Sequence, residues 1–479
     1  MYRKAKIVAT IGPACDSEPM LEKLLRAGVN VARLNFSHGL HTEHAARIAC
    51  LRQLSEKLGM SVGILQDLQG PKVRVGVLEP PLNLLEGEII RLHAEDNQTA
   101  QPQEKQVPVA LAELFEAVKV GDSILLDDGH LALEVIEIGA RELRARVLTG
   151  GRLSSHKGIN LPGVHLNIPG FTDKDRADLA FGILQEVDFV AISFVRTAHD
   201  IQMVRDAMDL IGERGAHPLL IAKLEQPEAL DNLEEILAIA DGVMVARGDL
   251  GVEMPPEAVP IAQKRIIQAA NRCGKIVITA TQMLDSMITN PLPTRAEASD
   301  VANAVFDGTD AVMLSGETAS GAYPLESVQF MNRIVCAAEA NFSEWGHYRA
   351  PDALTGDDES SITRAASELA HDLNVGVVTI FTRTGRTALL MSKARSRVPI
   401  LAFTPQLRTF RRMSLFWGVV PHAAPMVPTL REMVNHADSK LLLEGWAVSG
   451  QQVVVVVGFP VNNVRPSNMA LLHNVGEML

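Results

Sequence analysis

The sequence predicts an α/β protein: a (β/α)8 barrel with an inserted all-β domain and a C-terminal open-sheet α/β domain. Three observations predict this class. Short apolar runs alternate with helical stretches, one connection between two runs is far longer than a helix requires, and β/α alternation resumes after the eighth run. The chain has 479 residues, which at roughly 100 to 200 residues per domain predicts several domains.

Eight apolar runs are predicted as the parallel strands of a TIM barrel. They are rich in Ala, Val, Ile and Leu, as strands buried on both faces usually are. With the helices between them, they predict a barrel domain at residues 1–70 and 169–343. In chain order the runs are 6–10, 30–34, 62–66, 189–194, 219–224, 242–246, 275–280 and 311–314.

The connection between the third and fourth runs holds about 120 residues, far more than one helix. It contains Gly and Asp turn signals between short alternating strands such as 123–126 and 143–148. We therefore expect residues 71–168 to form an inserted β-barrel domain. An insertion after a barrel strand lies over the active-site face, so this domain is expected to act as a lid.

The last part of the chain is predicted as a separate regulatory domain at residues 344–479. Residues 344–360 are polar and irregular, which predicts a linker. Strand-like runs follow at 376–381, 400–403 and 453–457, with helical stretches between them. This pattern predicts an open, wound α/β sheet.

Composition argues against several classes of function. The net charge of -12 argues against nucleic acid or an anionic membrane as the main partner. The four cysteines, Cys15, Cys50, Cys273 and Cys336, form no CxxC pair, which favours reduced thiols over a zinc site or disulfides. We see no signal-peptide core and no run of about 18 apolar residues, so we expect a cytoplasmic chain without a membrane span.

The strongest chemical signal lies at the ends of the fifth and sixth runs, in Lys223-Leu224-Glu225 and Arg247-Gly248-Asp249. Alternate side chains of a strand share a face, so Lys223 should point with Glu225, and Arg247 with Asp249. In a parallel barrel the two carboxylates would meet at the active-site face. Such a pair beside an ammonium suits Mg²⁺ or Mn²⁺ with a phosphorylated substrate; a structural ion pair is the alternative.

Polar residues also close the second and third runs. Arg33, Asn35 and Ser37 occupy alternate positions and should project together, which fits phosphate and cation binding. Strand-end capping would explain the Asn or the Ser alone. Asp67 closes the third run just before the Gly70-Pro71 boundary, which fits either a closing lid or a plain domain boundary.

Three weaker signals remain. Lys157 precedes a glycine in the insertion, although a loop lysine is usually solvated. Thr279 and Thr281 end the seventh run on one expected face, although a buried threonine commonly bonds backbone. After a C-terminal strand, a helix opens with a loop suited to binding phosphate through backbone N–H groups, helix capping being the alternative. This loop is Thr382-Arg383-Thr384-Gly385-Arg386-Thr387.

Together these motifs resemble the pyruvate kinase family, from Lys4 to the end of the chain. The resemblance implies transfer of the phosphoryl group of phosphoenolpyruvate to ADP, which gives pyruvate and ATP in glycolysis. It also implies a homotetramer. The matching stretches are residues 9–14, 33–39, 223–225, 244–251, 279–287, 293–297 and 313–318.

The resemblance also implies roles for single residues. Glu225 and Asp249 should hold the divalent ion, Mg²⁺ or Mn²⁺. Lys223 should stabilise charge on the phosphoryl group and the developing enolate. The remaining substrate contacts should be Arg33 at the phosphate and Gly248, Asp249 and Thr281 at the pyruvate part, with the nucleotide at Asn35, Phe36, Ser37, His38, Arg74 and Lys157.

Two departures from the family pattern affect the cofactors. Many members that resemble this chain have Glu at Lys72 and Thr at Leu68, and bind K⁺ through the equivalents of Asn35, Ser37 and Asp67. A lysine could place an ammonium near that monovalent-cation site, so we expect activity that does not require K⁺. Ser320 stands where a lysine often lies near the nucleotide, which leaves the nucleotide preference open.

The loop at 382–387 resembles the family's sugar-phosphate effector site. Residues 458–463 do not look like the longer glycine-rich loop that clasps fructose 1,6-bisphosphate in some members. We therefore expect a sugar monophosphate as the allosteric activator. Two rival functions remain open at this point: a carbon–carbon lyase or aldolase that uses a pyruvate enolate, and a catalytically silent sensor of sugar phosphates.

Overall fold

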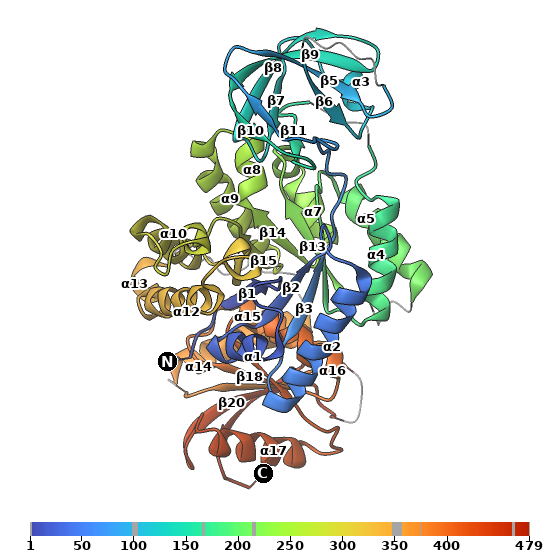
Figure 1. Cartoon of the computed structure of the whole chain (residues 1–479). Helices are drawn as coiled ribbons and strands as arrows, with labels where there is room; N and C mark the ends of the chain where they lie inside the picture. Colours follow the sequence, from blue (N-terminus) through green and yellow to red (C-terminus); the bar gives the residue numbers. More distant parts are fainter. Residues whose placement is uncertain are drawn as a thin grey trace.

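The computed structural model describes residues 2–97, 104–164, 168–212, 217–346, 357–373, 375–461 and 465–478. Figure 1 shows the inserted domain at the top, the barrel in the middle and the C-terminal domain at the bottom. Among the described residues, no helix is both long and apolar enough to cross a membrane.

Eight parallel strands close into a barrel in the order β1-β16-β15-β14-β13-β12-β3-β2, which confirms the predicted fold class. Most strand residues are buried, because helices cover the outside of the barrel and the side chains of the strands fill its inside. The strands are β1 (Lys6–Thr10), β2 (Val31–Asn35), β3 (Gly63–Asp67), β12 (Phe189–Ile192), β13 (Leu219–Leu224), β14 (Gly242–Ala246), β15 (Ile276–Ala280) and β16 (Ala311–Leu314).

The barrel helices begin and end at residues suited to those positions. Thr172 and Thr294 cap α4 and α10, and Gly28 and Gly59 end α1 and α2 in the left-handed conformation. The helices are α1 (Glu18–Ala27), α2 (His41–Leu58), α4 (Asp173–Leu184), α5 (Ala198–Ile211), α6 (Glu228–Asp231), α7 (Leu233–Ile239), α8 (Arg247–Glu253), α9 (Val259–Arg272), α10 (Arg295–Phe306), α11 (Gly316–Ala319), α12 (Pro324–Ala340) and α13 (Phe342–Trp345), with 3-10 turns η2 (Pro256–Ala258) and η3 (Asp285–Ile288).

The inserted domain has a six-stranded sheet, β11-β7-β8-β9-β5-β6, and a two-stranded sheet, β10-β4. Isolated bridges from Arg74 to Gly158 and from Val75 to Val109 join one segment to both edges of the larger sheet, which therefore curls around its own apolar core. Its elements are β4 (Leu82–Leu84), β5 (Ile89–Ala94), β6 (Lys105–Val109), α3 (Leu114–Ala117), β7 (Ser123–Leu126), β8 (Leu131–Ile138), β9 (Glu142–Thr149), β10 (Gly151–Leu153) and β11 (Ile159–Asn160).

The C-terminal domain is an open five-stranded sheet in the order β19-β18-β17-β20-β21, in which only β21 is antiparallel to its neighbour. The predicted linker is wrong at both ends, because Glu344 lies in α13 and Ser360 in α14; residues 347–356 lie outside the described residues. The elements are α14 (Asp358–Asp372), β17 (Val378–Phe381), α15 (Arg386–Lys393), β18 (Ile400–Thr404), α16 (Leu407–Arg412), η4 (Met413–Leu415), β19 (Val419–Ala423), α17 (Leu430–Leu443), β20 (Gln452–Val457) and β21 (Met469–Asn474).

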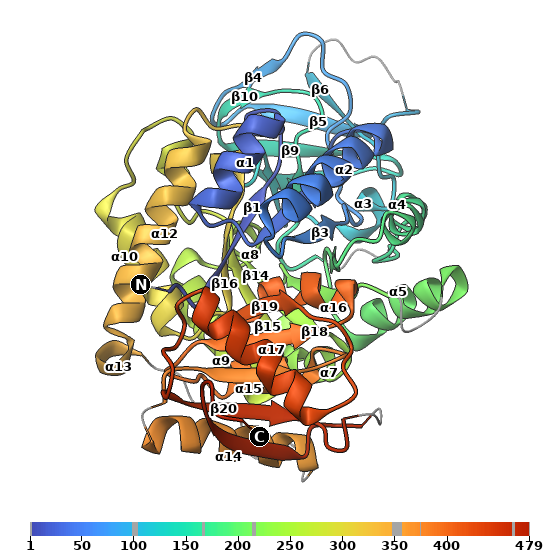
Figure 2. The ribbon, with the colours of Figure 1, turned by 90° about the horizontal axis from the view of Figure 1, so that it is seen from below.

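The C-terminal domain packs against the end of the barrel at which its strands begin (Figures 1 and 2). One cluster of buried apolar side chains includes Val8 and Leu65 of the barrel together with Val378 and Met413 of the C-terminal domain. The carboxyl ends of the strands therefore lie at the opposite end, beneath the inserted domain. Barrel enzymes place their active sites at that end.

Candidate active site

A buried lysine lies at the centre of the carboxyl end of the barrel. The Nζ atom of Lys223, on β13, is 2.7 Å from Glu225 Oε1 and 3.2 Å from Asp67 Oδ1, and it donates to Ser193 Oγ at 2.7 Å. Burial disfavours its charge, but the two carboxylates outweigh that effect and raise the pKa of Lys223. The ammonium is therefore held charged in a site that excludes most water.

Asp67 holds a second cation in the same cluster. Its Oδ2 atom accepts a hydrogen bond from Nε of Arg33 at 2.6 Å, while Arg33 Nη1 donates to Thr10 Oγ1 at 2.9 Å. Burial opposes the charge of Asp67, but Lys223 and Arg33 together lower its pKa. An ionised Asp67 thus orients both cations on the floor of the site.

Glu225 is fixed from its other side by a turn in the backbone. Its Oε2 atom accepts from the N–H of Phe194 at 2.7 Å, and Phe194 has a φ of 56°. The sequence predicts a strand over 189–194, but β12 ends at Ile192 because the left-handed conformation of Phe194 does not fit a strand. The pKa of Glu225 is raised to about 7, chiefly by burial; Lys223 opposes the rise, and the charge of Asp249 adds to it.

Asp249 lies on a helix, so the predicted strand-end position of Arg247 and Asp249 is wrong. Strand β14 ends at Ala246 and α8 begins at Arg247. The guanidinium of Arg247 bonds the carbonyl of Thr281 at 2.8 Å and the carboxylate of Asp300 at 2.6 Å. Successive helix residues differ by about 100° in direction, so Arg247 supports the backbone while Asp249 lies near Glu225.

The Thr281 side chain bonds backbone groups of its own strand end and of α8. It has a φ of 65°, its Oγ1 accepts from the N–H of Gly248 at 2.7 Å, and its hydroxyl donates to the carbonyl of Ala280 at 2.6 Å. The predicted shared face with Thr279 is wrong, because Thr279 Oγ1 bonds Thr309 Oγ1 in the buried core. Thr281 therefore joins the ends of β14 and β15.

The carboxylates suit a divalent cation as two of its ligands. Within the described residues, no group of three or more His, Cys, Asp and Glu side chains could hold a metal ion. Glu225 and Asp249 repel each other in a buried site, and a cation between them would relieve that repulsion. Mg²⁺ usually takes one or two protein carboxylates and completes its shell with water and substrate oxygens, so this pair fits it.

Basic residues from the barrel and the insertion gather at the edge of this cluster. Burial and the nearby charges of Arg74, Arg33 and Lys72 lower the pKa of His38. Arg74 Nη1 donates to the carbonyl of His156 at 3.0 Å. This edge offers several cationic and polar groups to a polyphosphate.

Other sequence-predicted nucleotide residues have structural partners. Asn35 Oδ1 accepts from the N–H of Ser37 at 3.1 Å. Phe36 is buried and stacks on His44 with ring centroids 4.1 Å apart. The ammonium of Lys157 is 2.7 Å from Asp127 within the insertion.

Lys72 lies between the insertion and α8. Its Nζ atom is 3.6 Å from Asp128 Oδ1 and 3.8 Å from Asp249 Oδ1. Asp67, the carboxylate of the predicted monovalent-cation site, is paired with Arg33 and Lys223. Leu68, from the same predicted set, is a buried core side chain.

Sequence reasoning missed Ser193, the N–H of Phe194 and the hydroxyl of Thr10. The sequence predicts a strand over the whole of 189–194, and no residue in that run indicates the turn at Phe194. Thr10 did carry a usable signal, because it is a polar residue that closes an apolar run facing the second strand.

The predicted effector loop borders a cavity of about 340 Å³ in the C-terminal domain. The loop joins β17 to α15, and Thr382 Oγ1 accepts from the N–H of Gly385 at 3.0 Å, where the φ of 87° suits glycine. Arg386 pairs with Asp357 and lies 3.5 Å from Glu359. Arg383, Thr384 and Thr387 also line the cavity, as do the apolar side chains of Phe381, Phe403, Met426 and Met433.

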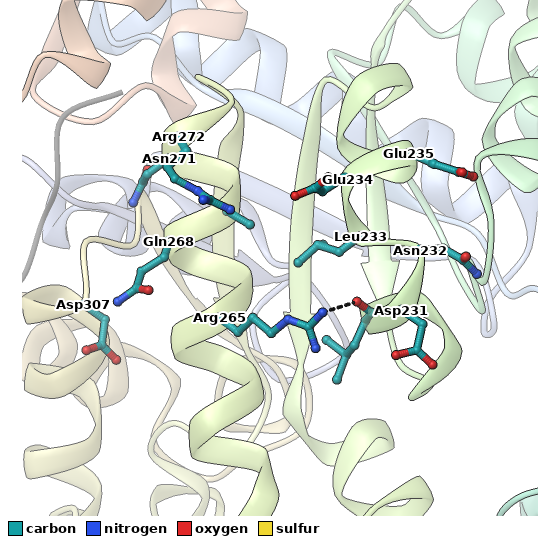
Figure 3. Close-up of a pocket in the computed structure, with 12 residues that line it drawn as sticks. Asp231, Asn232, Leu233, Glu234, Glu235, Arg265, Gln268, Asn271, Arg272 and Asp307 are labelled. Carbon is teal, nitrogen blue, oxygen red and sulfur yellow. Dashed lines mark hydrogen bonds between the residues drawn. The ribbon is translucent and has the colours of Figure 1, made fainter. Parts of the chain in front are cut away.

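A second groove, of about 400 Å³, lies on the outside of the barrel between α7 and α9 (Figure 3). Arg265 Nη2 bonds the carbonyl of Leu230 across it at 2.9 Å. The exposed Asp231, Glu234 and Glu235 give it mixed charge. It contains none of the residues described above.

A closed barrel with a buried lysine, the guanidinium of Arg33 and paired carboxylates beneath the inserted domain is typical of an enzyme that handles a phosphorylated anion with a divalent cation. Residues 2–328 match the family profile "Pyruvate kinase, barrel domain", and residues 360–473 match "Pyruvate kinase, alpha/beta domain". The chain belongs to the pyruvate kinase family and is a phosphotransferase.

Similar proteins share the whole length of the chain. A pyruvate kinase of Geobacillus stearothermophilus is 46% identical over 100% of this chain and 81% of its own. A pyruvate kinase of Agrobacterium vitis is 45% identical over 97% of both chains. One from Staphylococcus haemolyticus is 44% identical over 99% of this chain and 81% of its own.

Proposed function

We propose that this chain transfers the phosphoryl group of phosphoenolpyruvate to ADP, giving pyruvate and ATP, at the carboxyl end of its barrel. The observation that carries the proposal is the buried ammonium of Lys223, held by Asp67, Glu225 and Ser193. A phosphoryl group in transfer and an enolate both carry negative charge. A preorganised cation in a nearly water-free site stabilises that charge more than it would in bulk water.

Arg33 and Lys223 are proposed to act together on the substrate. Asp67 bonds both, so neither cation needs to reorganise when the substrate arrives. Arg33 would bind the phosphate, and Lys223 would face the oxygens on which charge develops. Thr281 and the backbone at Gly248 would contact the pyruvate part.

Members of this family generally use a divalent metal ion, and Glu225 and Asp249 are the proposed ligands. When bound, Mg²⁺ or Mn²⁺ would neutralise substrate charge as a Lewis acid. Phe194 and Lys223 fix the Glu225 carboxylate from opposite oxygens. Asp249 is directed to the site by α8, while Arg247 anchors that helix to the loop after β15.

The inserted domain is proposed as a lid that carries nucleotide contacts. We propose the same domain bounds as above: 71–168 for the inserted domain, 1–70 and 169–343 for the catalytic barrel, and 344–479 for the regulatory domain. Arg74 and Lys157 would bind ADP from the lid, with Asn35, Phe36, Ser37 and His38 on the barrel side. Closure would exclude the water that competes for the phosphoryl group.

We also propose that activity does not require K⁺. The ammonium of Lys72 already provides a monovalent charge 3.8 Å from Asp249. Replacing K⁺ by tetramethylammonium at constant ionic strength is expected to leave the rate unchanged. A steep loss of rate in that buffer would contradict the proposal.

A sugar monophosphate is proposed as an allosteric activator in the C-terminal cavity. Arg383, Arg386 and the N-terminus of α15 supply positive charge, while the apolar wall would face the sugar. Titration with several sugar monophosphates is expected to shift the phosphoenolpyruvate saturation curve to lower concentration. We also propose that the chain is cytoplasmic and forms a homotetramer. Light scattering would test the homotetramer.

The central test is pyruvate formation from phosphoenolpyruvate and ADP with Mg²⁺. We expect turnover by the wild-type chain and its near-complete loss in Lys223→Ala and in Glu225→Ala. Pyruvate released from a hydroxy acid without ADP would favour a lyase instead. Binding of sugar phosphate without any turnover would favour a silent sensor.

A further inference from the structure

Among the described residues, the inserted domain lies close to α8 at three points along this short helix. Lys72 lies 3.8 Å from Asp249 near the start of α8. A Cβ placed on Gly129, in the turn before β8, would lie 3.9 Å from the methyls of Val252. At the end of the helix, Asn160 of β11 donates from Nδ2 to Glu253 Oε1 at 2.9 Å.

The hydrogen bond between Asn160 and Glu253 is partly buried. Asn160 is only 7% exposed. Burial raises the pKa of Glu253, and the bond from Asn160 opposes that effect. A gap of about 60 Å³ beside the pair is lined by Val73, Leu161 and other insertion residues and by Phe194, Arg196 and Gln226 of the barrel. A hydrogen bond in such a partly buried place is stronger than one at the surface.

Helix α8 has little apolar packing of its own. Its buried residues are Arg247 and Leu250, so its position depends largely on polar contacts. Arg247 fixes the first residue to Thr281 and Asp300, and Asn160 fixes the last residue, Glu253. Asp249 lies between these two anchors.

We propose that Asn160 and Glu253 form a latch between the lid and α8, and that they are positioning residues for Asp249. Seating the lid would then place Asp249 for its divalent cation, and cation binding would favour the seated lid by the same coupling free energy. This inference rests on the proposed role of Asp249 as a metal ligand. It adds two residues that do not touch the substrate or the cation.

The test compares Asn160→Ala and Glu253→Gln with the wild-type chain. Glu253→Gln keeps an oxygen acceptor for Asn160 Nδ2 and is the conservative variant. Asn83→Ala, at an exposed asparagine of β4 in the same domain, is the matched control. The measurements are the Mn²⁺ dissociation constant by electron paramagnetic resonance without substrates, kcat and KM for ADP, and hydrogen exchange of the α8 amides.

In Asn160→Ala we expect the Mn²⁺ dissociation constant and the KM for ADP to rise about tenfold, within the usual range of coupling between sites. We expect kcat to fall less, and the amides of α8 to exchange faster. Glu253→Gln and Asn83→Ala should keep wild-type values. Mn²⁺ affinity and exchange in Asn160→Ala equal to those of Asn83→Ala would overturn the latch. A wild-type chain without turnover would instead contradict the proposed function, while Mn²⁺ affinity and exchange would still test the latch.

Discussion

Asp67 pairs with both Arg33 and Lys223, the two cations that we propose to be catalytic. It bonds Arg33 through one carboxylate oxygen and lies against Lys223 with the other, and both cations hold it ionised. An asparagine in its place would keep the shape and remove the charge. The partners of Asp67 come from β2 and β13, so their pairing depends on the barrel and could not be predicted from the residues alone.

We predict that Asp67→Asn lowers kcat by about 10²- to 10³-fold, the scale found when one preorganised electrostatic group is removed from an active site. The measurement is steady-state pyruvate formation with saturating phosphoenolpyruvate and ADP. Asp16→Asn is the control, because Asp16 pairs with Arg47 at 3.0 Å outside the site. Equal rates in the two variants would show that Asp67 does not hold the catalytic cations.

Lys6 is a buried amine at the contact between the barrel and the C-terminal domain. It donates to the carbonyl of Val419 at 2.7 Å, and burial, with a smaller effect from Arg3, lowers its pKa from 10.5 to about 7. In the unfolded chain Lys6 keeps its proton up to about pH 10.5. Between these values the unfolded state binds more protons, so this residue makes the folded state more stable as pH rises.

We therefore predict that the difference in unfolding free energy between the wild type and Lys6→Met changes between pH 7 and pH 10. The wild type should gain stability relative to the variant as pH rises through this window. Denaturant unfolding at several pH values measures the difference. A difference independent of pH would mean that Lys6 has the same pKa in both states.

At the scale of elements, the strands were predictable and the loops between strands and helices were not. The barrel strands are buried on both faces, so each is a visible apolar run in the sequence. The loops at the candidate site depend on backbone conformations that cannot be predicted from their residue types. Phe194 and Thr281 have positive φ, and Arg247 starts a helix where the sequence indicated the end of a strand.

Helix α15 connects the cavity of the C-terminal domain to the barrel. Its N-terminus borders the cavity, and at its other end Lys393 pairs with Asp310 and donates a hydrogen bond to Asn271 Oδ1 at 2.9 Å. Lys393 and Asp310 are each 1% exposed. Asp310 also accepts from the N–H of Val277 on β15, the strand that leads to Thr281. The ion pair therefore fixes α15 to β15, the barrel strand that precedes Thr281.

We predict that Lys393→Met lowers the free energy of unfolding by about 3 kcal/mol, because it leaves a buried carboxylate short of one partner. Urea unfolding followed by circular dichroism measures the loss. Lys440→Met, which removes a surface pair with Glu444 at 3.6 Å, should change the free energy by less than about 1 kcal/mol. Similar losses in the two variants would show that the interdomain pair contributes no more than a surface pair.

At the scale of the whole molecule, the clusters of buried apolar side chains do not coincide with the three domains predicted from the sequence. The barrel and the C-terminal domain share one cluster of buried side chains, whereas the inserted domain has a cluster of its own. Among the described residues, the insertion approaches α8 through Lys72, Gly129 and Asn160, and the first and last of these interactions are polar. The spacing of the strands in the sequence predicted the insertion. It could not predict that the barrel and the C-terminal domain share a core, because that depends on which side chains meet in the tertiary fold.

We predict that the insertion unfolds separately, and that the barrel and the C-terminal domain unfold together. Calorimetry of the full chain should show two transitions. A variant in which a short Gly-Ser linker replaces residues 71–168 should lose only the transition of the insertion, and it should make no pyruvate because Arg74, Lys157 and the lid are gone. The linker variant should also keep the far-ultraviolet spectrum of a folded α/β protein. A single transition in the full chain, or an unfolded linker variant, would mean that the barrel depends on the insertion for its stability, against the separation of the two apolar clusters.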